Sequence, residues 1–253
     1  MRNRRTGRGR RLAFGGRIRD SSRGRRPLPE HPGCARRQGC FSFRRPFWET
    51  DIAALKERIA NAGLVTLVTV GADGPIVSHL PLAYDPEAGP FGTLTGHLSR
   101  ANGQWRDTDT AKPALAMIMD EDAYVSPGWY ASKTEHGKVV PTWNYRTIYL
   151  RGRVSFFDEP ERLRANVEAL TERFERPFAE PWSVADAPAD YLKGQLRGIV
   201  GVSFAVEAIE GKSKLNQNRT PADQRGVAAA LERSEREADR QIADLMQTKL
   251  ERG

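Results

Sequence analysis

Residues 64–85 read LVTLVTVGADGPIVSHLPLAYD, two runs rich in β-branched residues on either side of Ala72-Asp73-Gly74-Pro75. An Asp-Gly pair between alternating apolar residues is a strong short-range signal for a β-hairpin. In the second run, the alternation places two sets of side chains on opposite faces: Ser78, Leu80 and Leu82 on one, and Val77, His79 and Pro81 on the other. The stretch therefore predicts an antiparallel pair of strands that carries polar groups beside apolar ones.

The segments around this hairpin predict the rest of the fold. A helix over 49–63 is expected to begin at Thr50 or Asp51 and to end at Gly63. Further strands are expected at 91–98, 113–120, 147–158 (with a bend or bulge at Gly152) and 199–211, further helices at 159–174 and 185–198, and one long charged helix from Pro221 to about Lys249. Since most strands follow each other through short turns, we expect a mainly β protein with peripheral helices (α+β), built as a small closed or split β-barrel.

The positive charge of the chain is concentrated at its N-terminus. Residues 1–45 contain 15 arginines and only two acidic residues, a net charge of +13, so the other 208 residues carry −5 of the total of +8. This Arg-, Gly-, Ser- and Pro-rich segment has too few apolar residues to offset the entropy of ordering, and we expect it to be a disordered tail. The expected organisation is a tail over 1–45, a barrel domain over 46–220, and a charged helix over 221–253 packed on the barrel or on a dimer.

Three origins for the tail stay open. Its Arg- and Ser-rich, acid-poor composition is similar to that of an organellar transit peptide. Clustered arginines also suit a nucleic-acid arm that neutralises phosphates. The interpretation that we favour is a start codon assigned too early, with translation beginning nearer Phe41.

The location of the cysteines and the apolar runs indicates a cytoplasmic protein without a membrane segment. Cys34 and Cys40 both lie in the tail, so neither a disulfide nor a thiolate metal site is expected in the folded part. The longest apolar runs, Leu64–Val70 and Ala114–Met119, are far shorter than a transmembrane helix.

Four segments are rich in hydrogen-bond donors and aromatic residues: VSHLPL (77–82), TGHLSRANGQW (95–105), SKTEHGKVVPTWNYRT (132–147) and GKSKLNQNR (211–219). Ser99, Arg100 and Asn102 follow a strand and open a turn, where hydroxyl, guanidinium and backbone N–H groups suit a phosphate. Taken singly, each of these residues is equally well a helix cap or a solvated surface group. Together the four segments favour one shared site for a flat, phosphorylated ligand.

Other kinds of site are excluded by their missing signatures. The folded part has only three histidines and no H-x-x-H or H-E-x-x-H, so we expect no metal. It also lacks a G-x-S-x-G elbow, a P-loop and a strand-linked G-x-G-x-x-G.

The same segments, in this order and together with DAYVSPGWY (122–130), resemble the FMN-binding negative transcriptional regulator (PaiB-like) family. The likeness covers about Pro46 to Leu231, and Asn216 is a departure, since the family pattern has serine there. The resemblance implies a split β-barrel similar to the pyridoxamine-phosphate oxidases and flavin reductases. It also implies a homodimer with FMN between the subunits.

The resemblance also suggests roles for individual residues. His97, Ser99, Arg100 and Asn102 would grip the FMN phosphate, while Ser78, His79 and Leu80 would run along the isoalloxazine ring. From the other subunit, a loop over 133–145 would lie on the flavin. The residues implied in that loop are Lys138, Thr142, Trp143 and Asn144. Residues 211–215 resemble a flavin-contacting stretch of the oxidases, which implies that Lys214 contacts the flavin, with Gln217 and Arg219 close by. Trp143 and Tyr145 equally suit the core of a dimer.

Three functions remain at this point. The first is an FMN-binding regulator, although the acidic folded part and the absence of a basic recognition helix do not support direct DNA binding. The second is an FMN-dependent oxidoreductase or flavin reductase that uses the same pocket, for which no catalytic residue is assigned because the cofactor carries the chemistry. The third is a haem- or small-molecule-binding barrel with His79 or His97 as a ligand.

Overall fold

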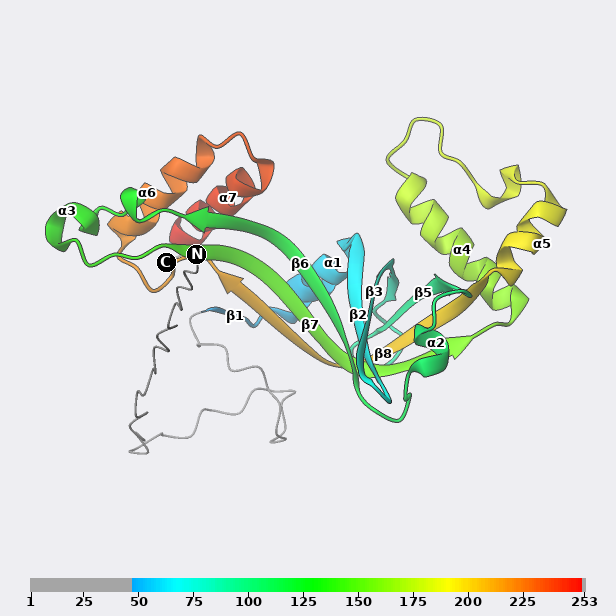
Figure 1. Ribbon diagram of the computed structural model, residues 1–253. Coiled ribbons are helices and arrows are strands. Elements are labelled where there is room, and N and C mark those ends of the chain that lie inside the picture. The colour runs from blue at the N-terminus through cyan, green and yellow to red at the C-terminus, as the bar shows by residue number, and fades with distance from the viewer. Residues whose placement is uncertain (1–46, 252–253) are drawn as a thin grey trace, which may run out of the picture. The chain divides into compact units, whose positions relative to one another are not determined.

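The computed structural model of the protein describes residues 47–251, and eight strands of these residues form a single antiparallel sheet (Figure 1). The strands are β1 (Trp48–Glu49), β2 (Leu64–Gly71), β3 (Gly74–Pro81), β4 (Ala83–Asp85), β5 (Thr93–Ser99), β6 (Ala114–Val125), β7 (Thr142–Phe157) and β8 (Ile199–Lys214). The helices are α1 (Ile52–Asn61), α2 (Gln104–Asp107), α3 (Ser132–His136), α4 (Pro160–Glu175), α5 (Ala189–Arg197), α6 (Pro221–Glu232) and α7 (Glu237–Glu251), with short 3-10 turns η2 (Pro127–Trp129) and η3 (Val184–Asp186). The expected tail over 1–45 lies outside the described residues.

The predicted hairpin is confirmed as β2 and β3, which pair from Leu64↔Pro81 to Gly71↔Gly74. The strand order is β3-β2-β6-β7-β8-β5-β4, and β1 pairs with β8. β3 also lies beside β5 without a backbone ladder between them, so the sheet curls into a barrel that stays open at this seam. The sheet and its flanking helices confirm the expected α+β class with a split barrel.

The core of the barrel is built from residues that alternate along the strands. Val65 and Leu67 of β2 and Phe204 of β8 are fully buried, and α1 adds Leu55 and Ile59. Asp51 caps α1 by accepting a hydrogen bond from Ala54 N at 3.1 Å, as expected from the sequence. These contacts fix the strands that carry the candidate site residues.

The bulge expected at Gly152 is confirmed. The pairing of β7 with β8 shifts register between Arg151 and Gly152, and a Cβ at Gly152 would overlap the backbone of Ala205. The bulge lets β7 bend strongly, so β6, β7 and β8 continue beyond the barrel as an arm. We call the segment from Tyr124 to Tyr145, with the end of β8 beside it, the arm (Figure 1).

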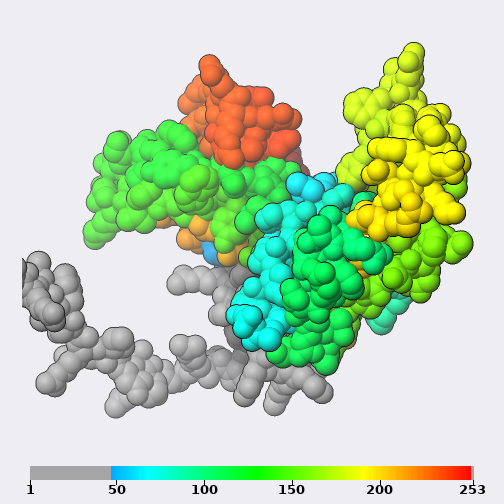
Figure 2. All heavy atoms as spheres, turned by 45° about the vertical axis from the view of Figure 1, so that its right-hand side comes forward, coloured from blue at the N-terminus to red at the C-terminus, as the bar shows by residue number. Residues whose placement is uncertain are grey.

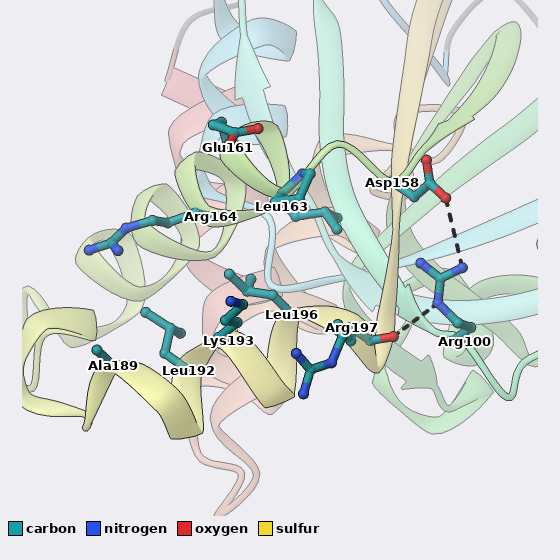
Figure 3. Close-up of a pocket in the computed structure, with 11 residues that line it drawn as sticks. Arg100, Asp158, Glu161, Leu163, Arg164, Ala189, Leu192, Lys193, Leu196 and Arg197 are labelled. Carbon is teal, nitrogen blue, oxygen red and sulfur yellow. Dashed lines mark hydrogen bonds and ion pairs between the residues drawn. The ribbon is translucent and has the colours of Figure 1, made fainter.

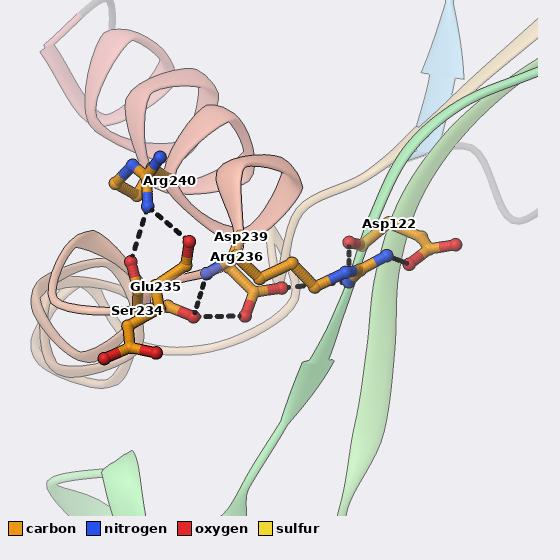
Figure 4. A network of polar contacts seen from close by, with 6 residues as sticks. All are labelled: Asp122, Ser234, Glu235, Arg236, Asp239 and Arg240. Carbon is orange, nitrogen blue, oxygen red and sulfur yellow. Dashed lines mark hydrogen bonds and ion pairs between the residues drawn. The ribbon is translucent and has the colours of Figure 1, made fainter.

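The expectation of one long C-terminal helix is wrong, because the chain turns between α6 and α7. Arg236 holds this turn: its guanidinium donates to Asp122 Oδ1 at 2.6 Å, to Asp122 O at 2.7 Å and to Asp239 Oδ1 at 3.0 Å (Figure 4). The turn folds α7 back, so that Leu231 of α6 and Ile242 of α7 are both buried in a second core on the arm. A straight helix would leave one of these apolar faces in water.

Candidate functional site

A cavity of about 790 Å³ lies where β3, β5 and α5 meet. Its lining residues are Val77, Ser78, His79, Leu80, Pro81, His97, Leu98, Ser99, Asn102, Gly194, Gln195, Gly198 and Ile199. We call it the β3–β5–α5 cavity. Figure 2 shows the α4–α5 segment (yellow) directly beside the barrel strands (cyan to green). Six of the residues expected from the sequence are thus gathered around one space of ligand size.

Each of the two serine hydroxyls in this cavity accepts one hydrogen bond from the chain itself. Ser78 Oγ accepts from Asn102 Nδ2 at 2.9 Å, and Ser99 Oγ accepts from Ala101 N at 3.3 Å. The hydroxyl protons of both serines can therefore still donate to a ligand. None of the lining residues is acidic. The cavity is consequently suited to an anion that accepts hydrogen bonds.

Gln104, which the sequence argument did not single out, holds the turn that follows β5. Its side chain is buried, and Nε2 donates to Thr69 Oγ1 at 3.0 Å and to Ile76 O at 3.2 Å. Its backbone N donates to Asn102 Oδ1 at 2.9 Å, which turns the Asn102 amide nitrogen toward Ser78. Its burial depends on partners in β2 and β3, so no local sequence pattern marks it.

His79 and Leu80 occupy opposite faces of β3, as the alternation predicted. Leu80 is 2% exposed and belongs to the barrel core, whereas His79 is exposed and its Nδ1 lies 3.0 Å from Thr66 Oγ1 on the neighbouring strand. The helix α5, which sequence reasoning did not connect with the site, supplies Gly194 and Gln195. Between the end of β5 at Ser99 and the start of α5 at Ala189 lie 89 residues, so no local pattern could predict this proximity.

Arg100 lies outside the β3–β5–α5 cavity. Its guanidinium donates to Arg197 O and to Ile199 O, each at 3.0 Å, and lies 3.9 Å from Asp158 (Figure 3). It borders a second cavity, of about 840 Å³, where Leu163 of α4 and Leu196 of α5 point toward each other. The side chain thus fastens the end of α5 to the start of β8.

For FMN, the cofactor that the resemblance implies, and for riboflavin, we expect Arg100→Ala to weaken binding alike. Loss of the two bonds to carbonyl oxygens should loosen α5, and about 1 kcal/mol corresponds to roughly a fivefold loss of affinity. Fluorescence titration with both flavins measures this. A loss confined to FMN would instead place Arg100 on the phosphate, as the sequence pattern suggested.

The remaining candidate residues lie on the arm. Lys214 Nζ donates to Trp143 O at 2.6 Å and also to the Thr142 hydroxyl. Burial, and next the charge of Lys212, lower the pKa of Lys214. Trp143 is half exposed and meets Tyr124 edge-on, with ring centroids 5.9 Å apart. This end of the arm offers an aromatic face beside a cation.

The other arm residues have partners within the chain, or are open to solvent. Gln217 bonds to the backbone of Ser213 and Leu215, and the Arg219 guanidinium lies 4.7 Å from the centre of the Tyr130 ring. Lys138 is exposed. Asn144 is fully buried, and its Nδ2 donates to Met246 Sδ of α7 at 3.3 Å.

Within one chain the arm residues do not reach the cavity. Ile199 borders the cavity at the start of β8, and Lys214 ends the same strand 15 residues later. An extended strand of that length spans up to about 50 Å. The two sets of candidate residues therefore cannot contact the same ligand unless they come from different copies of the chain.

The departure at Asn216 has a structural explanation. Asn216 has a φ of 62°, in the left-handed region that asparagine tolerates better than serine, and it is buried with Nδ2 3.4 Å from the Tyr130 hydroxyl. The residue turns the chain between β8 and α6. It is therefore a backbone feature of the arm.

Residues 47–251 lack two other kinds of feature. No three His, Cys, Asp or Glu side chains there form a group that could hold a metal ion. No helix of this part has the length and apolar composition needed to cross a bilayer.

Comparison with known proteins gives a family match over residues 42–208, to the domain described as "Putative FMN-binding domain". The chain is 32% identical over 187 residues to the Bacillus subtilis protein named "Protease synthase and sporulation protein PAI 2", covering 74% of this chain and 87% of that protein. An uncharacterized protein of Emericella nidulans is 26% identical, with 78% and 93% covered. Among solved structures, the FAD and haem binding protein of Mycobacterium smegmatis is 18% identical, with a TM-score of 0.47 over 66% of this chain and 73% of that chain.

Proposed function

Since this chain belongs to the family of FMN-binding domains and is similar to the Bacillus protein, we propose that it holds the FMN phosphate in the β3–β5–α5 cavity. The observation that carries the proposal is the set of unused hydroxyl protons at Ser78 and Ser99. His97 lines the same cavity, and no carboxylate does. A phosphate, which carries close to two negative charges and accepts hydrogen bonds only, fits this set of donors.

We further propose that the isoalloxazine ring extends along β3, past His79 and Leu80, toward the open seam of the barrel. Leu80, whose side chain is otherwise packed in the barrel core, is one of the apolar residues that line the cavity there. FMN bound there would supply one- and two-electron redox chemistry, while the residues of the chain bind and orient it.

The site is completed, in this proposal, by a second copy of the chain. The arm exposes Trp143, Tyr124 and Val140 at 46–63% of their surfaces, and exposed apolar side chains gathered together mark interaction surfaces. A two-fold partner would cover these residues and bring Lys214, with Thr142 and Trp143, to the flavin of the first copy. Lys138, Gln217 and Arg219 would stand at the margin of that contact.

We expect the purified protein to be a homodimer at micromolar concentration. Light scattering after size-exclusion chromatography measures the mass. Trp143→Ser should shift the equilibrium toward monomer and lower FMN content together, because one side chain serves both contacts. A monomeric native protein that retains full FMN affinity would contradict the role of the arm.

The absorbance spectrum of the purified protein, followed by identification of the released cofactor, tests the proposed function. We expect flavin bands and FMN itself. A Soret band, or a protein that binds neither FMN nor riboflavin on titration, would refute the proposal.

Whether the bound flavin serves regulation or catalysis is a separate question. A measurement of NADH and NADPH turnover answers it. We propose a regulatory role, which the resemblance to the PaiB-like regulators implies, without DNA contact by the folded part. Residues 46–253 carry a net charge of −5, and α6 and α7 mix acidic and basic residues. Steady oxidation of NADH or NADPH by the FMN-loaded protein would assign it to the flavin reductases instead.

A further inference from the structure

The imidazole of His97 contacts the side chain of Asn166 of α4. The contact lies at the edge of β5, beyond the point where β4 pairs with that strand. β4 pairs with β5 only as far as Ala83↔Thr95. At the next residue, Gly96, the backbone N and O are each 3.3 Å from the amide of Asn166, and His97 Nδ1 is 3.1 Å from the same amide. Asn166 is only 6% exposed, so its amide must find partners within the protein.

Only one orientation of this amide satisfies all three groups. Gly96 N is a donor, so the atom that faces it must be Oδ1; Gly96 O is an acceptor, so the atom that faces it must be Nδ2. In this orientation it is also Nδ2 that lies next to His97 Nδ1. Because Nδ2 can only donate, His97 Nδ1 must accept. The proton of the neutral imidazole is then on Nε2.

We propose that Asn166 is a positioning residue, which fixes His97 in the Nε2–H tautomer so that the neutral imidazole donates a hydrogen bond into the β3–β5–α5 cavity. This rests on the proposed phosphate site in that cavity. It makes His97 a third donor beside Ser78 and Ser99. Phosphate binding consequently does not require a protonated histidine.

Within residues 47–251, the side-chain hydrogen bond of His97 is made to Asn166. Among the residues that line the cavity, His79 is the other titratable one, and it lies on β3 with its Nδ1 3.0 Å from Thr66 Oγ1. β5, β8 and α5 contribute no ionisable side chain to the lining apart from His97 itself. The hydrogen bond from α4 is therefore the contact that fixes the imidazole.

The first test is spectroscopic and does not need flavin. Long-range ¹H–¹⁵N spectra of histidine-labelled protein at about pH 8.5, where an ordinary histidine of pKa about 6.5 is neutral, distinguish the two tautomers. Loss of signals in His97→Gln assigns the ring. We expect protonated Nε2 and unprotonated Nδ1 in the native protein, and the reverse in Asn166→Asp, whose carboxylate can only accept. Protonated Nδ1 in the native protein would overturn the proposal, whatever the protein's affinity for FMN.

The second test is the pH dependence of FMN affinity between about pH 6 and 8.5, a range that brackets the ordinary pKa of histidine. In Asn166→Asp the neutral imidazole would turn a lone pair toward the phosphate, whereas the imidazolium still donates. We expect this variant to lose at least tenfold more FMN affinity across the range than the native protein does, with little change for riboflavin. Titration of the phosphate itself affects both proteins and cancels in the comparison.

Asn61→Asp is the matched control, because it makes the same chemical change at an exposed position on α1. It should leave the pH dependence at its native value. If FMN affinity depends on pH in the same way in Asn166→Asp and Asn61→Asp, a role of Asn166 in FMN binding is refuted. If neither the native protein nor the variants bind FMN, the proposed function fails, while the tautomer is still decided by the spectra.

Discussion

A Ser99→Asp variant is expected to lose about a hundredfold in FMN affinity while its affinity for riboflavin changes little. Ser99 ends β5, and its hydroxyl borders the cavity in which we place the phosphate. Two unit charges about 4 Å apart repel by roughly 4 kcal/mol near a protein surface. Ser99 is exposed, so salt and water reduce this value. A net cost of about 2.7 kcal/mol corresponds to the hundredfold loss.

Fluorescence quenching by FMN and by riboflavin gives the two affinities. Ser99→Asn is the control, because it has the size of aspartate without the charge, and it should lose less than tenfold. The FMN defect of the aspartate variant should also diminish in about 1 M salt, where exposed charges are strongly screened. Equal losses for the two flavins would mean that the phosphate lies elsewhere in the protein.

The fold was predictable where local sequence and tertiary structure agree. The Asp-Gly turn and the alternation around it specify the β2/β3 hairpin, and the buried stripe Leu55 and Ile59 specifies α1. The glycine at position 152 predicted the bulge. A glycine is needed there because the backbone of Ala205 leaves no room for a side chain. In each case the determining contacts are local, or are imposed by one residue type.

The prediction of one long C-terminal helix is wrong because a contact between residues far apart in sequence determines the structure there. Nothing in residues 232–239 breaks a helix by propensity, and the turn between α6 and α7 depends on Arg236 reaching Asp122, which is 114 residues away. For Arg100, the neighbours in sequence predict a phosphate contact, which stays a prediction; they could not predict that its guanidinium donates to carbonyl oxygens 97 and 99 residues later. Local sequence patterns identify side chains whose chemistry suits a ligand. They do not show which of these side chains already form hydrogen bonds within the protein.

The second large effect is expected from Asp223→Ala, which should lower the free energy of unfolding by about 3 kcal/mol. Asp223 is 2% exposed, and its two carboxylate oxygens accept from Ser132 N at 2.8 Å and from Ser132 Oγ at 2.9 Å. These bonds fasten α3 to the first turn of α6. Each hydrogen bond to a charged group contributes about 1.5–3 kcal/mol, and removing the carboxylate leaves a buried N–H without its acceptor.

Urea denaturation at pH 7 measures the loss, with Asp244→Ala as the control. Asp244 is an exposed aspartate on α7, and its replacement should change the free energy of unfolding by less than about 0.5 kcal/mol. Because α3 and α6 support the arm, Asp223→Ala should also weaken dimerisation. A variant as stable as the control would show that the Ser132 contacts contribute little.

The difference in unfolding free energy between the native protein and Asp223→Ala should depend on pH. The direction in which the pKa of Asp223 is shifted predicts how. Burial alone would raise the pKa of Asp223, but the hydrogen bonds from Ser132, with the charge of Arg219 and the Thr220 hydroxyl, outweigh it and lower the pKa. A carboxyl group with a lowered pKa in the folded state contributes stability above its unfolded pKa of about 3.9, and this contribution is lost as the pH falls through the folded value. The gap between native and Asp223→Ala protein should therefore be constant from about pH 7 to 5 and narrow below about pH 4. Narrowing already above pH 5 would mean that the carboxylate is not stabilised by these bonds.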